Sequence, residues 1–327
     1  MHAVHNLKVA RWLVPNNDGW ELEVERFTRD SGADPGRRPL LMVPGYAMNA
    51  FILSFHPSGP SMVEYLVEAG FEVWTCNLRG QGGSRPITPA QRYGLRELAL
   101  VDLPIALGHV LAHTTTQRDS VDAVGCSLGA SLVYAYLAHH VEDHVLGAMI
   151  SIGGPLRWDD VHPAIRLAFR SARIAGAVRV RGTRRLARIA LPLVKRAPSL
   201  LAIYMNAEQV DLTAADQLVN TVENPVPHIN RQIARWIQQE DLVVDGVNVT
   251  DALLNARVPL LCVLANADGI VPVEAVLSAQ RAMPAADVEV LRVGDDDHWY
   301  AHADLFIAHE APKRVFEPMR AWLERHP

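Results

Sequence analysis

Residues 121–130 read Val-Asp-Ala-Val-Gly-Cys-Ser-Leu-Gly-Ala and contain the pattern Gly-x-Ser-x-Gly, with Ser127 between Gly125 and Gly129. An apolar run typical of a buried strand precedes the motif, and a helical pattern follows it from Leu128. Composition predicts roughly 0.05 such matches by chance in a chain of this size. This setting favours a nucleophile elbow, a sharp strand-to-helix turn that projects a serine hydroxyl above a sheet. The alternative is a glycine-rich packing turn between a strand and a helix, without any chemistry.

The glycines and the helix start explain what such a turn can do. Side chains two positions before and after the serine would collide at so sharp a bend, so glycine is required at both places. The amides that begin the following helix carry partial positive charge and favour a developing oxyanion. Cys126 stands directly before Ser127. Only the central residue of the turn faces a cleft, so we expect the Cys126 thiol to point into the core.

Further from the motif, short apolar runs alternate with longer helical patterns. Because parallel strands need crossover connections, this order predicts an α/β fold with a mostly parallel sheet and helices on both faces. A cluster of turn formers at 15–19 predicts an opening hairpin. The predicted strands are Leu40–Val43, Phe71–Cys76, Val121–Val124, Val145–Ile152, Pro259–Leu264 and Val288–Val293, and the predicted helices are Met62–Ala69, Leu95–Ala112, Leu128–His139, Val273–Met283 and Ala311–Arg325.

The alternation stops between Leu156 and about Thr250, where helical patterns and prolines occur without a convincing pair of strands. We interpret residues 156–250 as a helical cap, or lid, inserted into a core formed by residues 1–155 and 251–327. Residues 161–206 contain no Asp or Glu but ten of the 31 Lys and Arg residues of the chain. One interpretation is a solvated cap face. The other is a surface that makes transient contact with anionic lipid or takes acidic substrates.

Composition excludes several classes of protein. The chain has 327 residues, of which 49% are hydrophobic and 20% are charged, a balance typical of globular proteins. Its net charge of −5 argues against a general nucleic-acid binder. The two long uncharged stretches, 39–63 and 123–140, are broken by proline or glycine and do not predict membrane spans. The N-terminal residues lack the basic start and apolar run of a secretory signal, so we expect a cytoplasmic location.

The sequence gives no sign of a metal or a cofactor. Cys76, Cys126 and Cys262 each end or lie in an apolar run, which favours buried thiols over a disulfide or a metal set. No cluster of metal-ligating residues occurs, and no phosphate-binding glycine loop is followed by Lys. We therefore expect neither a metal nor a cofactor.

Several stretches around the motif resemble segments of the α/β-hydrolase family. Residues 40–46 resemble its strand and oxyanion turn, and Asn77–Ser84 is similar to the Arg-Gly-x-Gly-x-Ser loop after its next strand. The stretch from Tyr300 to Val315 resembles the end of acid-lipase and polyhydroxyalkanoate-synthase-like members. The resemblance covers most of the chain outside the predicted cap and implies a serine hydrolase.

The resemblance implies a catalytic triad in the chain order serine, acid, histidine. Asp268 follows a late apolar run and matches the acid position, although a turn or capping Asp would look the same locally. His298, His302 and His309 all follow the last predicted strand. The resemblance favours His302, because His302-Ala303-Asp304-Leu305 matches the family pattern His-x-Asp-Leu/Phe. Asp295-Asp296-Asp297 predicts a solvated acidic loop that raises the pKa of a nearby histidine.

The resemblance also implies an oxyanion hole and a mechanism. The hole is expected to combine the backbone N–H groups of Leu128 and Tyr46, although many members have His-Gly where this chain has Pro44-Gly45. Ser127 would attack an acyl carbonyl, His302 would carry the proton, and Asp268 would orient the imidazole.

The expected activity is therefore the hydrolysis of small-molecule carboxylic esters with an apolar acyl group, as in lipases and esterases. A serine nucleophile argues against dehalogenase or epoxide-hydrolase chemistry, because those relatives use Asp at the elbow. Two alternatives remain open. One is an acyltransferase or polyester-related enzyme with the same triad, and the other is a non-catalytic binding protein of the same fold.

Overall fold

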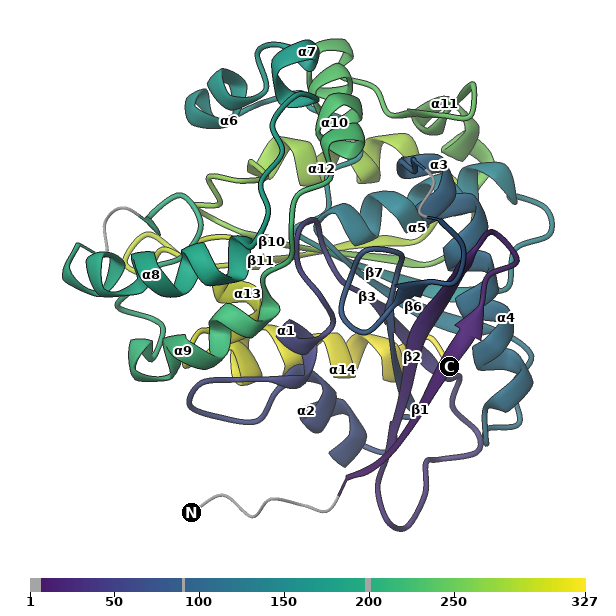
Figure 1. Cartoon of the computed structure of the whole chain (residues 1–327). Helices are drawn as coiled ribbons and strands as arrows, with labels where there is room; N and C mark the ends of the chain where they lie inside the picture. Colours follow the sequence, from purple (N-terminus) through teal and green to yellow (C-terminus); the bar gives the residue numbers. More distant parts are fainter. Residues whose placement is uncertain (1–6, 90–91, 198–200) are drawn as a thin grey trace.

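The computed structural model describes residues 7–89, 92–197 and 201–327 (Figure 1). The first six residues, on which much of the interpretation of the N-terminus rests, lie outside this range. The main sheet has the predicted character, mostly parallel with helices on both faces. Its strands are β1 (Lys8–Pro15), β2 (Trp20–Thr28), β3 (Leu40–Val43), β4 (Val73–Asn77), β5 (Arg85–Pro86), β6 (Val121–Cys126), β7 (Leu146–Ile152), β10 (Leu260–Ala265) and β11 (Val288–Val293).

The strand order is β1-β2-β4-β3-β6-β7-β10-β11, with β5 paired to β2. All neighbours from β4 through β11 are parallel, while β1 and β2 form the predicted opening hairpin and join β4 in antiparallel register. β6, which leads into the Gly-x-Ser-x-Gly motif, lies between β3 and β7 at the centre of the sheet. Its end is therefore enclosed on both sides by neighbouring strand ends.

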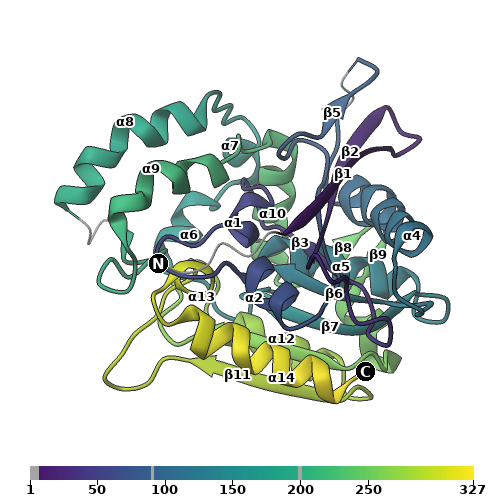
Figure 2. The ribbon, with the colours of Figure 1, turned by 90° about the horizontal axis from the view of Figure 1, so that it is seen from below.

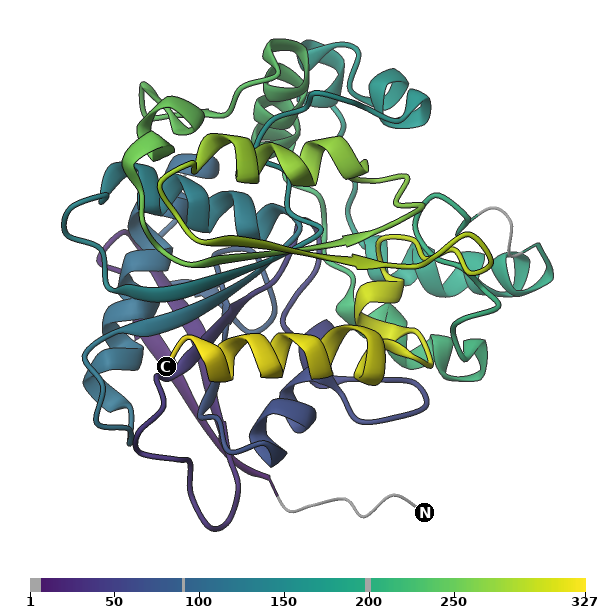
Figure 3. The ribbon, with the colours of Figure 1, turned by 180° about the vertical axis from the view of Figure 1, so that it is seen from behind.

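Helices cover the sheet in two layers: α4, α5 and α12 on one face, and α2 and α14 on the other (Figure 3). The helices and helical turns outside residues 156–248 are α1 (Phe51–Ser54), α2 (Met62–Glu68), α3 (Leu95–Glu97), the π-helical η1 (Leu98–Asp102), α4 (Leu103–His113), α5 (Leu128–His139), α11 (Val249–Ala252), η5 (Leu253–Asn255), α12 (Val273–Ala282), α13 (Asp304–Ile307), the π-helical η6 (Pro312–Phe316) and α14 (Glu317–Arg325).

β3 shows why the short apolar runs predict strands covered on both faces. Leu40 and Met42 pack into the core on the α2 and α14 side, whereas Leu41 and Val43 pack into the core on the α5 and α12 side. All four side chains are buried. Because successive side chains of a strand point to opposite faces, a strand between two helical layers is apolar at every position.

Residues 156–250, the insertion hereafter, lie between β7 and β10 and consist mainly of helices. Figure 2 shows α8 and α9 on the side of the molecule away from β1 and β2. The described part of the chain contains no helix that combines the length and the apolar character needed to cross a bilayer. The elements of the insertion before α11 are α6 (Pro163–Ala168), α7 (Ala172–Ala175), α8 (Thr183–Arg196), η3 (Leu212–Ala214), α9 (Ala215–Leu218), η4 (Val219–Thr221), α10 (Pro227–Gln239), β8 (Val243–Val244) and β9 (Val247–Asn248).

The β8–β9 hairpin was not predicted, although the sequence contains a signal for it. Asp245 and Gly246 form its two-residue turn, and both have positive φ. This conformation is typical of the Asp-Gly turns that connect short antiparallel strands. Two-residue strands are too short to show an alternating pattern, so the turn was the only local evidence.

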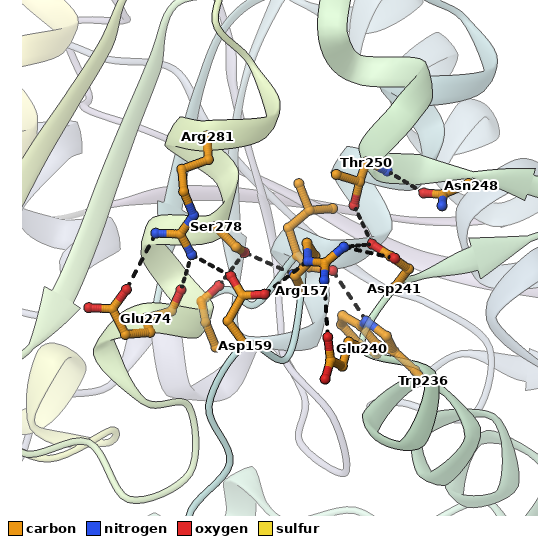
Figure 4. Close-up of polar contacts among 12 residues, drawn as sticks. Arg157, Asp159, Trp236, Glu240, Asp241, Asn248, Thr250, Glu274, Ser278 and Arg281 are labelled. Atoms are coloured by element: carbon orange, nitrogen blue, oxygen red, sulfur yellow. Dashed lines mark hydrogen bonds and ion pairs between the residues drawn. The ribbon is translucent and has the colours of Figure 1, made fainter.

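Arg157 holds together the two ends of the insertion (Figure 4). Its guanidinium donates to both carboxylate oxygens of Asp241, at 2.7 and 2.8 Å, and to Asp159 at 2.9 Å. Its backbone N–H donates to Ser278 Oγ of α12 at 2.8 Å, and Arg281 of α12 also pairs with Asp159. An ion pair within a network is stronger than a lone surface ion pair. The network therefore fixes the base of the insertion on α12.

A buried ion pair fixes the loop after β4, the loop that resembles Arg-Gly-x-Gly-x-Ser. Arg79 Nη2 donates to Asp102 Oδ1 at 2.7 Å, and the backbone N–H of Arg79 donates to Asp102 Oδ2 at 3.0 Å. Asn16 donates to the same carboxylate, and Asp18 accepts from Arg79 Nη1 at 2.7 Å. Asp102 is fully buried. Removal of the arginine would leave an uncompensated charge in the core.

We therefore predict that Arg79→Leu lowers the free energy of unfolding by about 3–5 kcal/mol. Arg85→Leu is the control, because Arg85 pairs with Glu21 in an exposed position and should contribute less than about 1 kcal/mol. Urea unfolding of the two variants measures the difference. Equal losses in both variants would contradict the assignment.

Candidate active site

Ser127 occupies a strained turn between β6 and α5. Its backbone has φ 52° and ψ −122°, a positive φ that residues other than glycine rarely adopt. A Cβ atom at Gly125 would lie 2.3 Å from Ala130 Cα, and one at Gly129 would lie 2.4 Å from Val43 O. No side chain fits at either position. The turn between β6 and α5 is thus packed directly against the first residues of α5 and against the end of β3, as the motif requires.

Ser127 is held in place by a hydrogen bond of its backbone, which leaves its side chain free of this contact. The Ser127 N–H donates to Ile152 O at the end of β7, at 2.8 Å. Cys126 is fully buried, and burial raises the pKa of its thiol. A neutral thiol in the core is a poor nucleophile. Cys76 and Cys262 are likewise buried free thiols.

Asp268 and His302 form a buried pair. His302 Nδ1 lies 2.6 Å from Asp268 Oδ2, and the two side chains are 5% and 1% exposed. The other carboxylate oxygen, Oδ1, accepts the N–H groups of Ile270 and Val271 at 2.8 and 2.9 Å. Because an ionised carboxylate only accepts hydrogen bonds, Nδ1 carries the proton in the neutral imidazole and Nε2 is left as the acceptor.

The loop after β7 brings this pair next to Ser127. A Cβ atom at Gly153 would lie 2.9 Å from His302 Cε1, and one at Gly154 would lie 3.4 Å from Ser127 O. The imidazole and the serine turn therefore pack against adjacent residues of one loop. Among the described residues, no hydrogen bond joins the Ser127 hydroxyl to the imidazole. Such bonds are often long without substrate and tighten in the reactive complex.

The two residues predicted to form an oxyanion hole lie on either side of the turn. A Cβ atom at Gly45 would lie 3.0 Å from Ser127 Cβ, so the segment leading to Tyr46 packs on the serine. Within the described chain, the N–H of Tyr46 donates to no acceptor, and the N–H of Leu128 is in the first turn of α5, where amides lack intrahelical partners. The Tyr46 hydroxyl instead accepts the Val226 N–H at 3.0 Å and contacts Asn230 of α10.

The other two histidines after β11 lie elsewhere. His298 is exposed and contacts Asp295 Oδ1 at 3.0 Å, and this hydrogen bond lowers the pKa of Asp295. His309 contacts Ser58 Oγ at 2.8 Å on the surface. The acidic loop thus holds His298, whereas the carboxylate that contacts His302 is Asp268.

A segment of the insertion, residues 203–206, bonds to the loops that carry both members of the pair. We call it the strap. Ile203 O accepts the N–H of Gly269, next to Asp268, at 3.1 Å, and Tyr204 O accepts the N–H of Ala303, next to His302, at 2.8 Å. The sequence carries no local sign of the strap, because no periodic pattern marks an irregular segment.

Asp304 anchors the end of the strap. Its fully buried carboxylate accepts the Asn206 N–H at 2.9 Å and the Ala301 N–H at 2.7 Å. Asn206 Nδ2 also donates to Trp299 O at 2.9 Å. Burial and, to a smaller extent, the charge of Asp268 raise the pKa of Asp304 to about 7, against the opposing effect of the N–H donors. Asp304 had entered the sequence analysis only as part of a matching pattern, without a role.

A small cavity adjoins the serine turn. It has a volume of about 20 Å³, enough for roughly one water molecule. Tyr46 and Leu128 line it, together with Leu132 of α5 and with Val226 and Ile229 of the insertion; Ser127 itself does not. A cleft of about 630 Å³ has Arg79 and Arg96 in its lining and includes none of Ser127, Asp268 and His302.

Comparisons with known proteins agree with this architecture. Residues 38–302 match the family model described as the alpha/beta hydrolase fold. A putative lipase from Acinetobacter baumannii shares 15% identity, with a TM-score of 0.64 over 98% of this chain and 93% of the other. A thermophilic esterase from Thermogutta terrifontis shares 21% identity, with a TM-score of 0.63 over 98% and 100%.

A haloalkane dehalogenase from Agrobacterium tumefaciens is similar at 14% identity, with a TM-score of 0.61 over the whole of both chains. A search of curated protein sequences finds no significant match. At these identities the likeness shows the fold, which hosts more than one chemistry. The mechanism has to be argued from the site.

We predict that Asp304 makes stability fall as the pH rises. The carboxyl titrates near 3.8 in a model compound and at about 7 in the folded chain, so between these values the folded state binds more protons than the unfolded state. The free energy of unfolding therefore decreases from about pH 4 to about pH 7. Asp304→Asn should remove this contribution.

Urea unfolding of the native protein and of Asp304→Asn across this pH range provides the measurement. The native protein should lose stability relative to the variant as the pH increases. A difference that stays constant, or that grows in favour of the native protein, would show that Asp304 is ionised throughout.

Proposed function

Because the chain belongs to the alpha/beta hydrolase fold family, we propose that it is a serine hydrolase that cleaves carboxylic esters with an apolar acyl group. The observation that carries the proposal is the buried Asp268–His302 pair, packed on the same loop as the strained turn of Ser127. Lipases and esterases among the structural neighbours support a hydrolase. Serine at the turn favours acyl transfer to the hydroxyl over dehalogenation.

In the proposed mechanism, the Ser127 hydroxyl attacks the ester carbonyl while His302 Nε2 accepts its proton. Asp268 keeps the proton on Nδ1 and stabilises the imidazolium. The tetrahedral intermediate collapses, the alkoxide leaves with the proton from Nε2, and an acyl-enzyme on Ser127 remains. Water, deprotonated by the same imidazole, then releases the carboxylic acid.

The N–H groups of Leu128 and Tyr46 are proposed to stabilise the oxyanion. Each such donor contributes roughly 3 kcal/mol when it is held in place before the reaction. The free amide at the start of α5 supports Leu128, because the helix dipole adds to its partial charge. The close packing of Gly45 on Ser127 supports the turn that carries Tyr46.

We propose that the insertion is a cap that shapes the acyl site. The Tyr46 hydroxyl bonds to Val226 and Asn230, which join the predicted oxyanion turn to α10. Leu98, Leu132 and Ile229 form an apolar part of the wall of the cavity at this junction, which also includes Arg79, Gln81, Glu223 and Asn224. Its small volume in this closed arrangement implies that α10 shifts when an acyl chain enters.

We predict that Ser127→Ala lowers kcat for p-nitrophenyl butyrate by at least about 10⁴-fold, because the nucleophile is lost. Cys126→Ala is the matched control at the neighbouring position, and it should retain activity. The release of p-nitrophenol, followed in a stopped or a continuous assay, measures kcat for both variants. Loss of activity in Cys126→Ala with retention in Ser127→Ala would overturn the proposal.

Butyrate as the main product in the presence of added alcohol would favour hydrolysis over acyl transfer.

A second pair of variants tests the choice of histidine. His302→Ala should lower kcat by about 10⁴-fold or more, since no general base then reaches Ser127. His298→Ala should change kcat less than about twofold, because His298 is exposed and contacts only the acidic loop. The reverse pattern would assign the catalytic role to His298.

A further inference from the structure

A second cleft, of about 470 Å³, lies between the segment after α7 and the first turns of α10, and three arginines line it. Arg92, Arg179, His228 and Arg231 line it, and no acidic residue is among its described lining residues. Such a volume is in the range of small-molecule sites. The rest of the chain carries more acidic than basic residues, so a cleft with this lining is an exception to the net charge of −5.

The arginines of this cleft have no carboxylate partner among the described residues. Arg231 Nε is buried without a hydrogen-bond partner, and its stem packs on Gly176, where a Cβ atom would lie 2.6 Å from Nε. Arg179 has no hydrogen bond or ion pair with any described residue. A buried donor without an acceptor costs free energy unless a ligand or water satisfies it.

Arg92 adds to the positive potential of the cleft, and its contact with His228 leaves that charge in place. An Nη2 atom of Arg92 lies 2.6 Å from His228 Nδ1. Because the guanidinium can only donate, His228 Nδ1 must accept, and the imidazole is neutral there. Burial and the charge of Arg92 lower the pKa of His228. Arg92 therefore keeps its charge uncompensated by any carboxylate that contacts it in the described chain.

Other arginines of the insertion show the contrast. Arg157 has Asp159, Glu240 and Asp241 as partners, and Arg184 contacts Glu223 at 2.8 Å. These guanidinium groups serve structural ion pairs. Arg92, Arg179 and Arg231 have no such carboxylate partner among the described residues, and they line one cleft.

The basic cleft adjoins the proposed acyl site. Tyr93 and Val226 line both the cleft and the small cavity that contains Tyr46 and Leu128 in its wall. The Val226 N–H donates to the Tyr46 hydroxyl, so Val226 is part of the wall between the two spaces. A molecule held at the serine turn would extend into the cleft after a modest shift of this wall.

We propose that the cleft binds an anionic group, a carboxylate or a phosphate, carried by the ester substrate. The proposal rests on the proposed function, and it names the substrate class of that same site. The planar guanidinium of Arg231 offers paired donors to either anion, which makes the pairing stronger and more directional than a lysine would. A small anion fits the recessed position of Arg231 better than a membrane surface does, because the side chain is half-buried.

Two pairs of matched esters test the proposal by activity. p-Nitrophenyl hemisuccinate and p-nitrophenyl butyrate differ by a carboxylate on the acyl side, and 4-carboxyphenyl butyrate and phenyl butyrate differ by one on the alcohol side. In at least one pair, Arg231→Gln should lower the ratio of kcat/KM for the anionic ester to that for the neutral ester by about tenfold. The ratio cancels losses of folded protein or of general activity.

Arg235→Gln is the matched control, since Arg235 lies one turn later on α10, is exposed and does not line the cleft. It should leave the ratio unchanged. Arg179→Gln is a second test variant at an exposed position of the cleft, and it should lower the ratio in the same pair of esters. An unchanged ratio in both test variants, or equal changes in Arg235→Gln, would overturn the proposal.

Binding of glutarate and of inorganic phosphate to Ser127→Ala, measured by isothermal titration calorimetry, separates this proposal from the proposed function. Saturable binding that weakens about tenfold or more in Ser127→Ala/Arg231→Gln, but not in Ser127→Ala/Arg235→Gln, supports an anion site even if no ester is hydrolysed. Ester hydrolysis without either this binding or a change in the ratio would retain the hydrolase and refute the anionic substrate. Binding of phosphatidylserine vesicles, but not of glutarate, to this cleft would assign its arginines to a lipid surface. That result would also refute the anionic substrate.

Discussion

The structure depends on one strained residue. Ser127 has positive φ, a conformation that costs a residue other than glycine on the order of 1–3 kcal/mol. The cost is offset by packing that only this turn permits: Gly125 lies against Ala130, and Gly129 lies against β3, at distances that exclude any side chain. α5, which begins at the next residue, is buried on nearly every side and cannot rotate to relieve the turn. The hydroxyl is thereby held above the sheet, outside the core that the same helix fills.

The remaining groups of the site reach this turn from distant parts of the chain, and each is fixed by hydrogen bonds to main-chain groups. Asp268 is held by two backbone amides of its own loop, and His302 is held by Asp268. The strap then joins both loops to the insertion through Ile203 and Tyr204. The insertion is thus part of the support of the site. A change in the strap would alter the geometry of the pair without touching it.

Which parts of this site the sequence predicted depends on how far apart along the chain the interacting residues lie. The Gly-x-Ser-x-Gly turn and the strands around it were predictable, because close approach and alternating burial leave a local pattern of glycine and apolar residues. Asp268 and His302 were nominated by resemblance, and their contact joins residues 34 positions apart. The strap bonds Asn206 to Asp304, 98 positions away, through irregular segments that carry no period. The excess of arginine in 161–206 indicated a basic surface, but two arginines of the cleft, Arg92 and Arg231, come from outside that stretch.

The most direct test of the account is to locate the covalent adduct formed with a fluorophosphonate, by intact mass and then by peptide mapping. The reagent phosphonylates a serine only where a base and an oxyanion site activate it. The account predicts a single adduct per chain, on Ser127, formed by folded protein and abolished by unfolding in urea. An adduct on another residue, or an intact and folded protein that never reacts, would contradict it.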